Sequence, residues 1–91
     1  MANKQQCAEG LYKLFNIAIN AASDDDKAEG LLVESDTGAF KSLCDRLGTN
    51  EQKMQDMGLL RLDVEFGDSV FLNVNEIMTV KDAQAQVQPQ R

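Results

Sequence analysis

The chain has 91 residues, of which 43% are hydrophobic, and fifteen acidic against nine basic residues give it a formal net charge of −6. This length suits one domain, and the hydrophobic content is typical of a globular protein and too high for a disordered one. The negative charge disfavours binding to phosphate backbones and anionic lipid. It favours a basic partner, and it also suits a surface that merely keeps a small protein in solution.

The first predicted element is a long helix over residues 3–22. Apolar residues recur along it with the helical period and share one side. Ile17 breaks this pattern, because it lies among polar positions near Gly10 and Ala21. A single exposed apolar side chain is common and would explain this position. The alternative is a small contact patch formed by these three residues.

A short second helix is predicted over residues 24–33. Ser23 is a suitable N-cap, and the three aspartates after it are favoured by the partial positive charge at a helix start. Gly30 weakens this helix, so a short strand over residues 31–34 remains the alternative.

Two further helices are predicted over residues 36–47 and 50–57. The first has apolar residues at positions i, i+3, i+4 and i+7, and Gly48 follows the last of them, where a left-handed residue commonly ends a helix. For the second, Thr49 and Gln52 have the spacing of a capping box.

The clearest pattern in the chain is the alternation of apolar and polar residues on both sides of Gly67-Asp68-Ser69. It predicts an antiparallel β-hairpin with strands over 59–66 and 70–74, followed by a turn and a short third strand over 77–80. From residue 82 Gln and Ala dominate. We therefore expect one compact α+β domain over 1–81, with N-terminal helices packed on the hairpin or meander, and a disordered tail over 82–91.

The register of the hairpin follows from its apolar residues. A three-residue loop pairs Phe66 with Val70 and Val64 with Leu72, so the aliphatic side chains of both strands share one face. A two-residue turn would set apolar residues of one strand beside polar residues of the other. The three-residue loop leaves Phe71 on the polar face.

Phe71 is the centre of the predicted interaction surface. An aromatic side chain with a charged rim is typical of a protein-interaction hot spot. The predicted partner-binding residues are Phe71, Arg61, Asp63, Glu65, Asn73 and Ile17. The alternative is that a helix or the third strand covers Phe71, which would give the sheet two buried faces.

The sequence gives no support for catalysis, a cofactor or a metal site. There is no histidine, which removes the commonest general base and metal ligand. Cys7 and Cys44 lie on the apolar faces of predicted helices, so we expect them to be buried free thiols in a protein of a reducing compartment. No signal peptide opens the chain and no apolar run is long enough for a membrane span, so we expect a non-enzymatic cytoplasmic protein.

Residues 40–57 resemble a helix-turn-helix, because an apolar helix, a glycine turn and a capped second helix follow one another. The hairpin after them resembles the wing of a winged helix. This resemblance implies a nucleic-acid-binding regulator. The charge argues against it, since Glu51 and Asp56 outweigh Lys53 on the second helix.

The function expected from these observations is a small acidic module that binds a partner protein and modulates or inhibits it. Small inhibitors from phage and other mobile elements are similar in size and charge. The alternatives are a winged-helix-like nucleic-acid-binding regulator and a homo-oligomer that sequesters a small ligand. A homodimer formed through an exposed edge strand is also compatible with the short predicted sheet.

Overall fold

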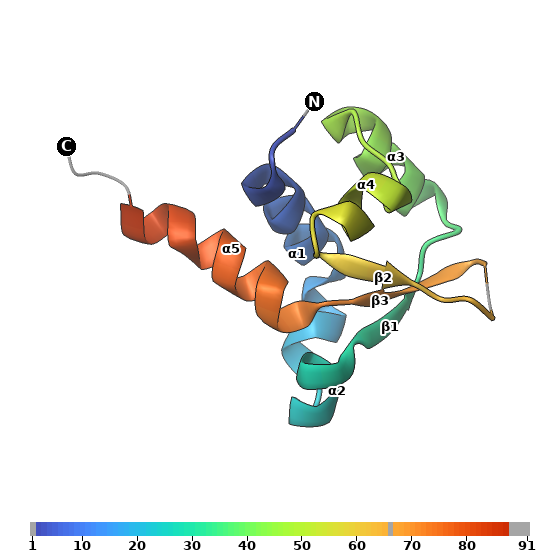
Figure 1. Cartoon of the computed structure of the whole chain (residues 1–91), viewed down its shortest axis with the longest axis horizontal. Helices are drawn as coiled ribbons and strands as arrows, with labels where there is room; N and C mark the ends of the chain where they lie inside the picture. Colours follow the sequence, from blue (N-terminus) through green and yellow to red (C-terminus); the bar gives the residue numbers. More distant parts are fainter. Residues whose placement is uncertain (1, 66, 88–91) are drawn as a thin grey trace.

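The computed structural model describes residues 2–65 and 67–87, which form five helices and a three-stranded sheet (Figure 1). The architecture is α+β, as predicted from the sequence. The elements in chain order are α1 (Lys4–Ala21), α2 (Asp24–Glu29), β1 (Leu31–Glu34), α3 (Gly38–Leu47), α4 (Glu51–Asp56), β2 (Leu60–Leu62), β3 (Ser69–Leu72) and α5 (Val74–Val87). Within the described ranges, none of the helices combines the length and apolar character needed to cross a bilayer.

The sheet has the strand order β1-β3-β2, and both neighbours of the central strand β3 are antiparallel to it. Phe71 at the centre lies opposite Leu32 on one side and Arg61 on the other. Directly opposite residues of an antiparallel pair project to the same face. These three side chains therefore form a row across one face of the sheet.

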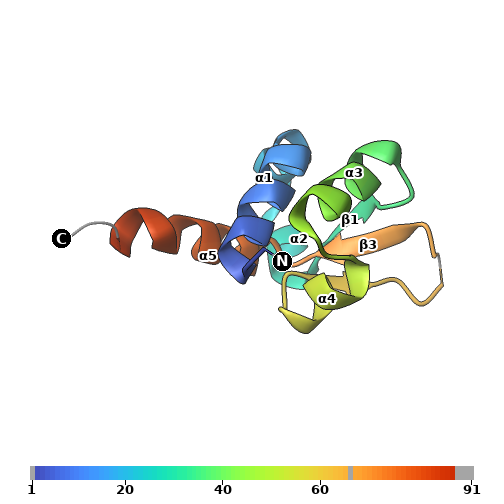
Figure 2. The same cartoon turned by 90° about the horizontal axis from the view of Figure 1, so that it is seen from above.

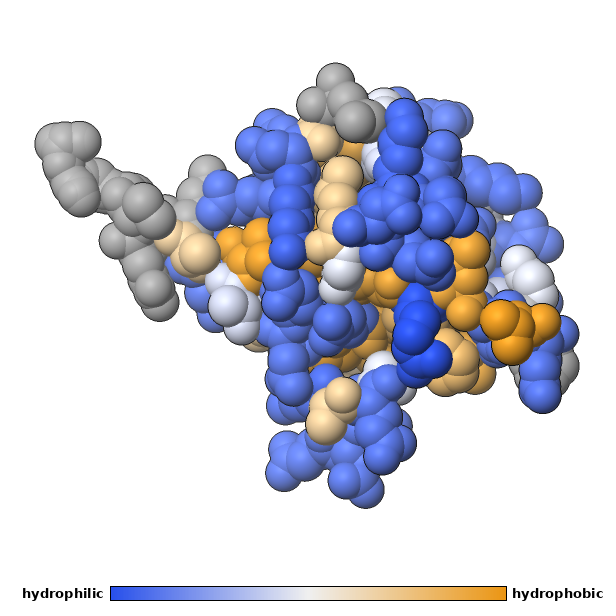
Figure 3. Space-filling view, viewed as in Figure 1, coloured by the Kyte–Doolittle hydropathy of each residue, from blue (hydrophilic) through white to orange (hydrophobic). Residues whose placement is uncertain are grey.

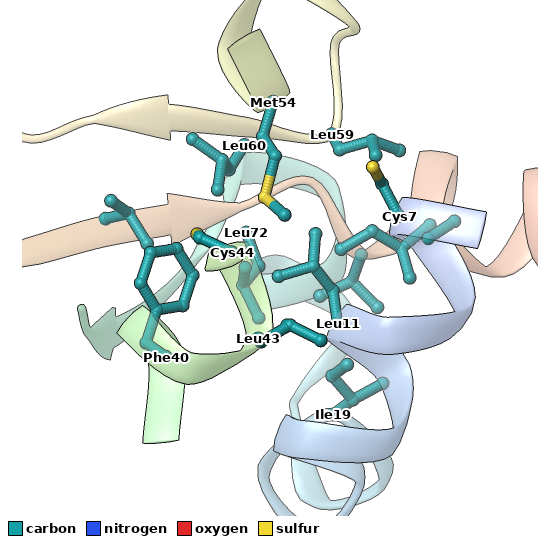
Figure 4. Packing of buried hydrophobic residues seen from close by; sticks show 14 residues of the cluster. Cys7, Leu11, Ile19, Phe40, Leu43, Cys44, Met54, Leu59, Leu60 and Leu72 are labelled. Carbon is teal, nitrogen blue, oxygen red and sulfur yellow. The ribbon is translucent and has the colours of Figure 1, made fainter. Parts of the chain in front are cut away.

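The other face of the sheet packs against helices, and together they form the core. Figure 4 shows side chains of α1, α3 and α4 converging on Leu60 and Leu72 of the sheet. Both leucines are buried, as are Leu11, Phe40 and Met54 from the helices. Burying each such side chain contributes about 1.5–3 kcal/mol, so this layer of contacts holds the sheet to the helices.

Helix α1 confirms the long helix predicted over 3–22. Asn3 and Gln6 form a capping box: Asn3 Oδ1 accepts from the Gln6 amide at 2.8 Å, and Gln6 Oε1 accepts from the Asn3 amide at 3.0 Å. At Phe15 the backbone leaves the helical region (φ −112°, ψ 23°) and the helix is kinked. The Phe15 ring packs against Phe40 of α3, with the ring centroids 6.3 Å apart.

Helices α3 and α4 lie close to their predicted ranges. Gly48 has the expected left-handed conformation (φ 67°, ψ 36°) after α3. The N-cap of α4 is Asn50, whose side chain accepts from the Lys53 amide at 2.9 Å. The capping box predicted at Thr49 and Gln52 was therefore one residue too early.

The helix predicted over 24–33 is too long. Helix α2 ends at Glu29, and Gly30 follows with φ 126° and ψ 132°, a conformation that L side chains rarely adopt. Residues 31–34 form strand β1 and pair with β3. The alternative prediction of a short strand here is correct. Strand β3 supplies the backbone hydrogen bonds that residues 31–34 would otherwise make within a helix.

The hairpin keeps its predicted faces but not its predicted register. The sequence predicted that Phe66 pairs with Val70, but the residue opposite Val70 is Leu62. The pairing is therefore displaced by four residues along the first strand of the hairpin. The connection is longer than three residues, and Val64 lies within it, 98% exposed. Phe66 lies outside the described residues. An odd number of residues still separates the paired positions, so the inward and outward side chains within β2 and β3 are as predicted, whereas Val64, predicted to point inward, does not.

The strand predicted over 77–80 is wrong, because these residues belong to helix α5. Asn73 begins this helix: its Oδ1 accepts from the Glu76 amide at 3.5 Å and its carbonyl accepts from the Ile77 amide at 2.9 Å. Val74 and Ile77 are fully buried where α5 packs against α1. Figure 2 shows α5 running from there away from the other elements. The tail predicted over 82–91 falls partly in α5, which continues through Val87, and partly in residues 88–91, which lie outside the described part.

Candidate interaction surface

The outer face of the sheet is the face turned away from the core, and it carries the side chains of Leu32, Glu34, Arg61, Ser69 and Phe71. Leu32 is 51% exposed, and Arg61 and Glu34 are also exposed. Figure 3 shows hydrophobic residues reaching the surface in the region of the strands, whereas the helices present mostly hydrophilic ones. This face is the largest part of the sheet that is accessible to a partner.

Phe71 is half-buried at the centre of the outer face. The guanidinium carbon of Arg61 lies 4.7 Å from the centroid of its ring, and Arg61 Nη2 donates to the Glu29 carbonyl at 3.0 Å. Arg61 thus crosses the sheet from β2, over the ring, to the residue before Gly30. Gly30 also approaches Phe71 so closely that an added Cβ would lie 3.0 Å from the Phe71 Cβ and 3.3 Å from Arg61 Nη2. The Arg61 side chain and the turn at Gly30 both lie against Phe71, which remains partly exposed.

A hollow of about 380 Å³ lies beside Phe71 and Arg61. The α2–β1 turn forms one wall and the α4–β2 turn the other. Gln55 and Asn73 contribute amide groups to its lining. Each of these amides also makes a structural hydrogen bond, from Leu62 N–H to Gln55 Oε1 at 2.9 Å and from Asn73 Nδ2 to the Gly58 carbonyl at 3.1 Å. The positively charged side chain in the lining of the hollow is that of Arg61.

Four of the six predicted site residues lie outside the outer face, three of them in or after the hairpin and Ile17 on α1. Asp63 and Glu65 are in the β2–β3 connection, where Asp63 Oδ1 accepts from the Glu65 amide at 2.9 Å. This bond makes a local turn and leaves the Glu65 side chain exposed. Asn73 serves as the start of α5 and as a link to Gly58, so its contacts are those of a structural residue.

Ile17 lies on α1, away from the sheet, and is 83% exposed. Ala21 is also exposed, but Gly10 is not part of the same patch. A Cβ added at Gly10 would lie 2.8 Å from Leu43 Cδ1, because α3 packs closely on α1 at this point. Of the predicted patch, Ile17 and Ala21 are exposed on α1, whereas Gly10 is in the contact between α1 and α3.

Two exposed hydrophobic residues were absent from the predicted site. Leu32 lies beside Phe71 on β1, and Val64 lies in the β2–β3 connection. Alternation within the run Leu31–Glu34 could have placed Leu32 on the outer face, had that run been taken as a strand. Val64 could not have been found in this way, because its alternation with Leu62 continues past the end of β2.

The described residues hold no arrangement suited to metal binding: no cluster of three or more Cys, Asp or Glu side chains is placed to hold an ion. Both cysteines are free and buried. Burial raises the pKa of the Cys7 thiol, and burial followed by the charges of Glu51 and Asp45 raises the pKa of Cys44. Raised values disfavour the nucleophilic thiolate, so neither thiol is set up for covalent chemistry.

Comparisons with models of protein families, with curated proteins and with solved structures find no similar protein. Function is therefore inferred from the surface described above and from the charge of the chain.

Proposed function

We propose that the protein is a small acidic interaction module that binds a partner protein through the outer face of its sheet and thereby modulates or inhibits it. The observation that carries this proposal is the row Leu32–Phe71–Arg61, an apolar and aromatic centre in which Leu32 and Arg61 are exposed and Phe71 is half-buried. Aromatic residues and arginine are the side chains most enriched in the energetically important centres of protein interfaces.

The electrostatics support a basic partner. The net charge is −6, and exposed acidic residues lie close to the outer face at Glu29 and Glu34. Opposite charges across an interface accelerate encounter and penalise wrong partners. An acidic module with an apolar centre is thus suited to a basic protein surface that has an apolar residue of its own.

The experiment is capture from an extract of the source cells, with the chain immobilised. Leu32→Glu places a charge in the apolar centre, and Ile17→Glu makes the same kind of change on α1, where Ile17 is 83% exposed. We expect Leu32→Glu to abolish capture of a partner and Ile17→Glu to retain it, with circular dichroism showing both variants folded. Equal capture by both variants, or loss only with Ile17→Glu, would contradict the proposed surface.

A second candidate function is nucleic-acid binding by a winged helix. The order of α1, β1, α3, α4, β2 and β3, with β3 between the other two strands, resembles a winged helix, and the β2–β3 connection then takes the place of the wing. The charges oppose this function, because Asp63, Glu65 and Asp68 make that connection acidic where phosphate contact needs cations. Titration of duplex DNA at low salt tests it, and absence of binding there removes it.

A further inference from the structure

The two edges of the sheet differ in whether a helix packs along them, since α4 lies against β2 and bonds to one of its outward amides. In an antiparallel ladder, alternate residues direct both N–H and C=O toward a given neighbour. The Asn73 amide donates to the Leu59 carbonyl at 2.9 Å, so Leu59 and Asn73 are a hydrogen-bonded pair. The next hydrogen-bonded pair, two residues further along the ladder, is Arg61 and Phe71. Leu60 and Leu62 therefore direct their backbone groups away from β3, toward the outer edge of β2.

The edge formed by β2 is closed by helix α4. The outward N–H of Leu62 donates to Gln55 Oε1 at 2.9 Å, and α4 packs along this strand. Exposed strand edges recruit further strands, and natural proteins commonly cover them with such elements. A partner strand is thus kept away from β2.

The edge formed by β1 is open. The Ser35 amide donates to the Asp68 carbonyl at 2.8 Å, which continues the ladder in which Leu31 and Val33 bond to β3. Leu32 and Glu34 then direct their N–H and C=O groups outward. Among residues 2–65 and 67–87, none provides a hydrogen-bond partner for these four groups. Both side chains also lie on the outer face, so the open edge and the apolar centre are continuous.

We propose that β1 accepts an extended segment of the partner protein as a fourth, antiparallel strand. This inference rests on the proposed function and specifies how the partner is held. The segment's backbone would bond to the four outward groups of Leu32 and Glu34, and its alternate side chains would lie on the outer face next to those two residues. Strand addition of this kind draws affinity from backbone bonds and specificity from the neighbouring side chains.

The chemistry of β1 sets the sequence of that segment. The residue opposite Glu34 is Lys or Arg, because opposite charges on directly opposed residues stabilise a strand pair. The residues opposite Val33 and Leu32 are aliphatic. In the antiparallel sense the segment therefore reads, from its N-terminus, basic, aliphatic, aliphatic.

A second copy of this chain fits the edge less well. Pairing of two β1 strands about Val33 would satisfy the outward groups but would set Leu32 of each chain against Glu34 of the other. The two chains, each with a charge of −6, would also repel each other. The occupant favoured by charge is a basic partner.

Amide hydrogen exchange tests this proposal residue by residue. The probe is an acetylated, amidated heptapeptide with the sequence Thr-Ser-Lys-Val-Leu-Ser-Thr, and its control has Glu in place of Lys. At a peptide concentration ten times the dissociation constant, exchange at Leu32 and Glu34 should slow about tenfold. Leu31 and Val33, already bonded to β3, should change little. The glutamate peptide should bind at least several times more weakly.

A matched pair of variants separates the edge from the outer face. Glu34→Pro and Glu34→Ala both remove the carboxylate, but only proline removes the outward N–H, and proline is tolerated on an edge strand where that group faces solvent. We expect Glu34→Pro to lose the peptide and the captured partner, and Glu34→Ala to retain weaker binding of both. If capture is lost with Leu32→Glu but is equal for the two Glu34 variants, the interaction surface stands and strand addition is wrong.

Three other results would overturn the inference. They are unchanged exchange at Leu32 and Glu34 with millimolar peptide, equal binding of the lysine and glutamate peptides, and protection of both amides that rises with protein concentration when no peptide is present. The last result would identify a second copy as the occupant.

Discussion

Gln55 and Leu62 are joined by a hydrogen bond of 2.9 Å in which the backbone amide of the strand donates to the side-chain oxygen of the helix. This bond satisfies the outward N–H of Leu62 on β2. Gln55→Ala removes the acceptor and should lower the free energy of unfolding by about 0.5–1.5 kcal/mol. Gln55→Glu keeps an acceptor in place and should cost less.

Urea denaturation measures both variants, and hydrogen exchange at the Leu62 amide reports on the bond directly. Exchange there should accelerate in Gln55→Ala and remain slow in Gln55→Glu. Equal exchange rates in the two variants would show that some other feature protects this edge.

Arg61 and Phe71 form the second coupled pair. An exposed cation over an aromatic face contributes about 0.5–1 kcal/mol. Arg61→Met keeps an apolar stem over the ring and removes the charge, while Phe71→Leu keeps apolar bulk and removes the aromatic face. A double-mutant cycle of these two changes should therefore give a coupling energy of about 0.5–1 kcal/mol. Additive effects would mean that Arg61 stabilises the sheet only through its bond to Glu29.

The alternation of residues was sufficient to predict the two faces of the hairpin. Leu60 and Leu62 point inward with Val70 and Leu72, because the face of a side chain depends only on its parity along the strand. The length of the connection could not be obtained in the same way. The alternation continues through Val64, although that residue is 98% exposed and lies beyond the end of β2.

Local pattern left strand β1 as one of two alternatives, because the strand that it pairs with is distant in sequence. Residues 31–34 are too short for their period to separate strand from helix, and pairing with β3 decides the outcome. The open edge, and with it Leu32 as a site residue, follows from that pairing. The sequence thus indicated Phe71 and Arg61 as site residues, whereas the strand beside them was predicted only as the alternative to a helix.

Helix α5, by contrast, carried a signal that could have been used. Asn73 and Glu76 have the spacing of a helix start, and Val74, Ile77 and Met78 recur with the helical period. The β-branched residues Thr79 and Val80 favoured a strand instead. Tertiary packing on α1 outweighs that local preference, since Val74 and Ile77 are fully buried.

Substitutions at two positions of α5 test its helical state. Ile77 is fully buried, so Ile77→Ala should cost about 2–5 kcal/mol. Thr79 is exposed, and Ala has the higher helix propensity, so Thr79→Ala should raise the free energy of unfolding by up to about 0.7 kcal/mol. In a strand the same change would lower it. The sign for Thr79→Ala in urea denaturation therefore separates the two structures.

The buried thiols predict how stability changes at alkaline pH. Burial raises the pKa of Cys7 and of Cys44 above the ordinary value of 9.0. On raising the pH, the unfolded chain therefore loses these protons before the folded chain does. Their contribution is fully present below pH 9.0 and is lost as the pH rises through the higher folded values, so the free energy of unfolding should fall above that pH.

Urea denaturation between pH 7 and pH 10.5 measures this fall, and the Cys7→Ala, Cys44→Ala double variant is its control. The double variant is less stable at every pH, because it loses buried groups, but its free energy of unfolding should decline less steeply over the alkaline range. Parallel pH profiles would show that the two thiols titrate alike in the folded and unfolded chains.

Native protein should also react slowly with a thiol reagent at pH 8 and rapidly once unfolded, because the thiolate is disfavoured only while both cysteines are buried.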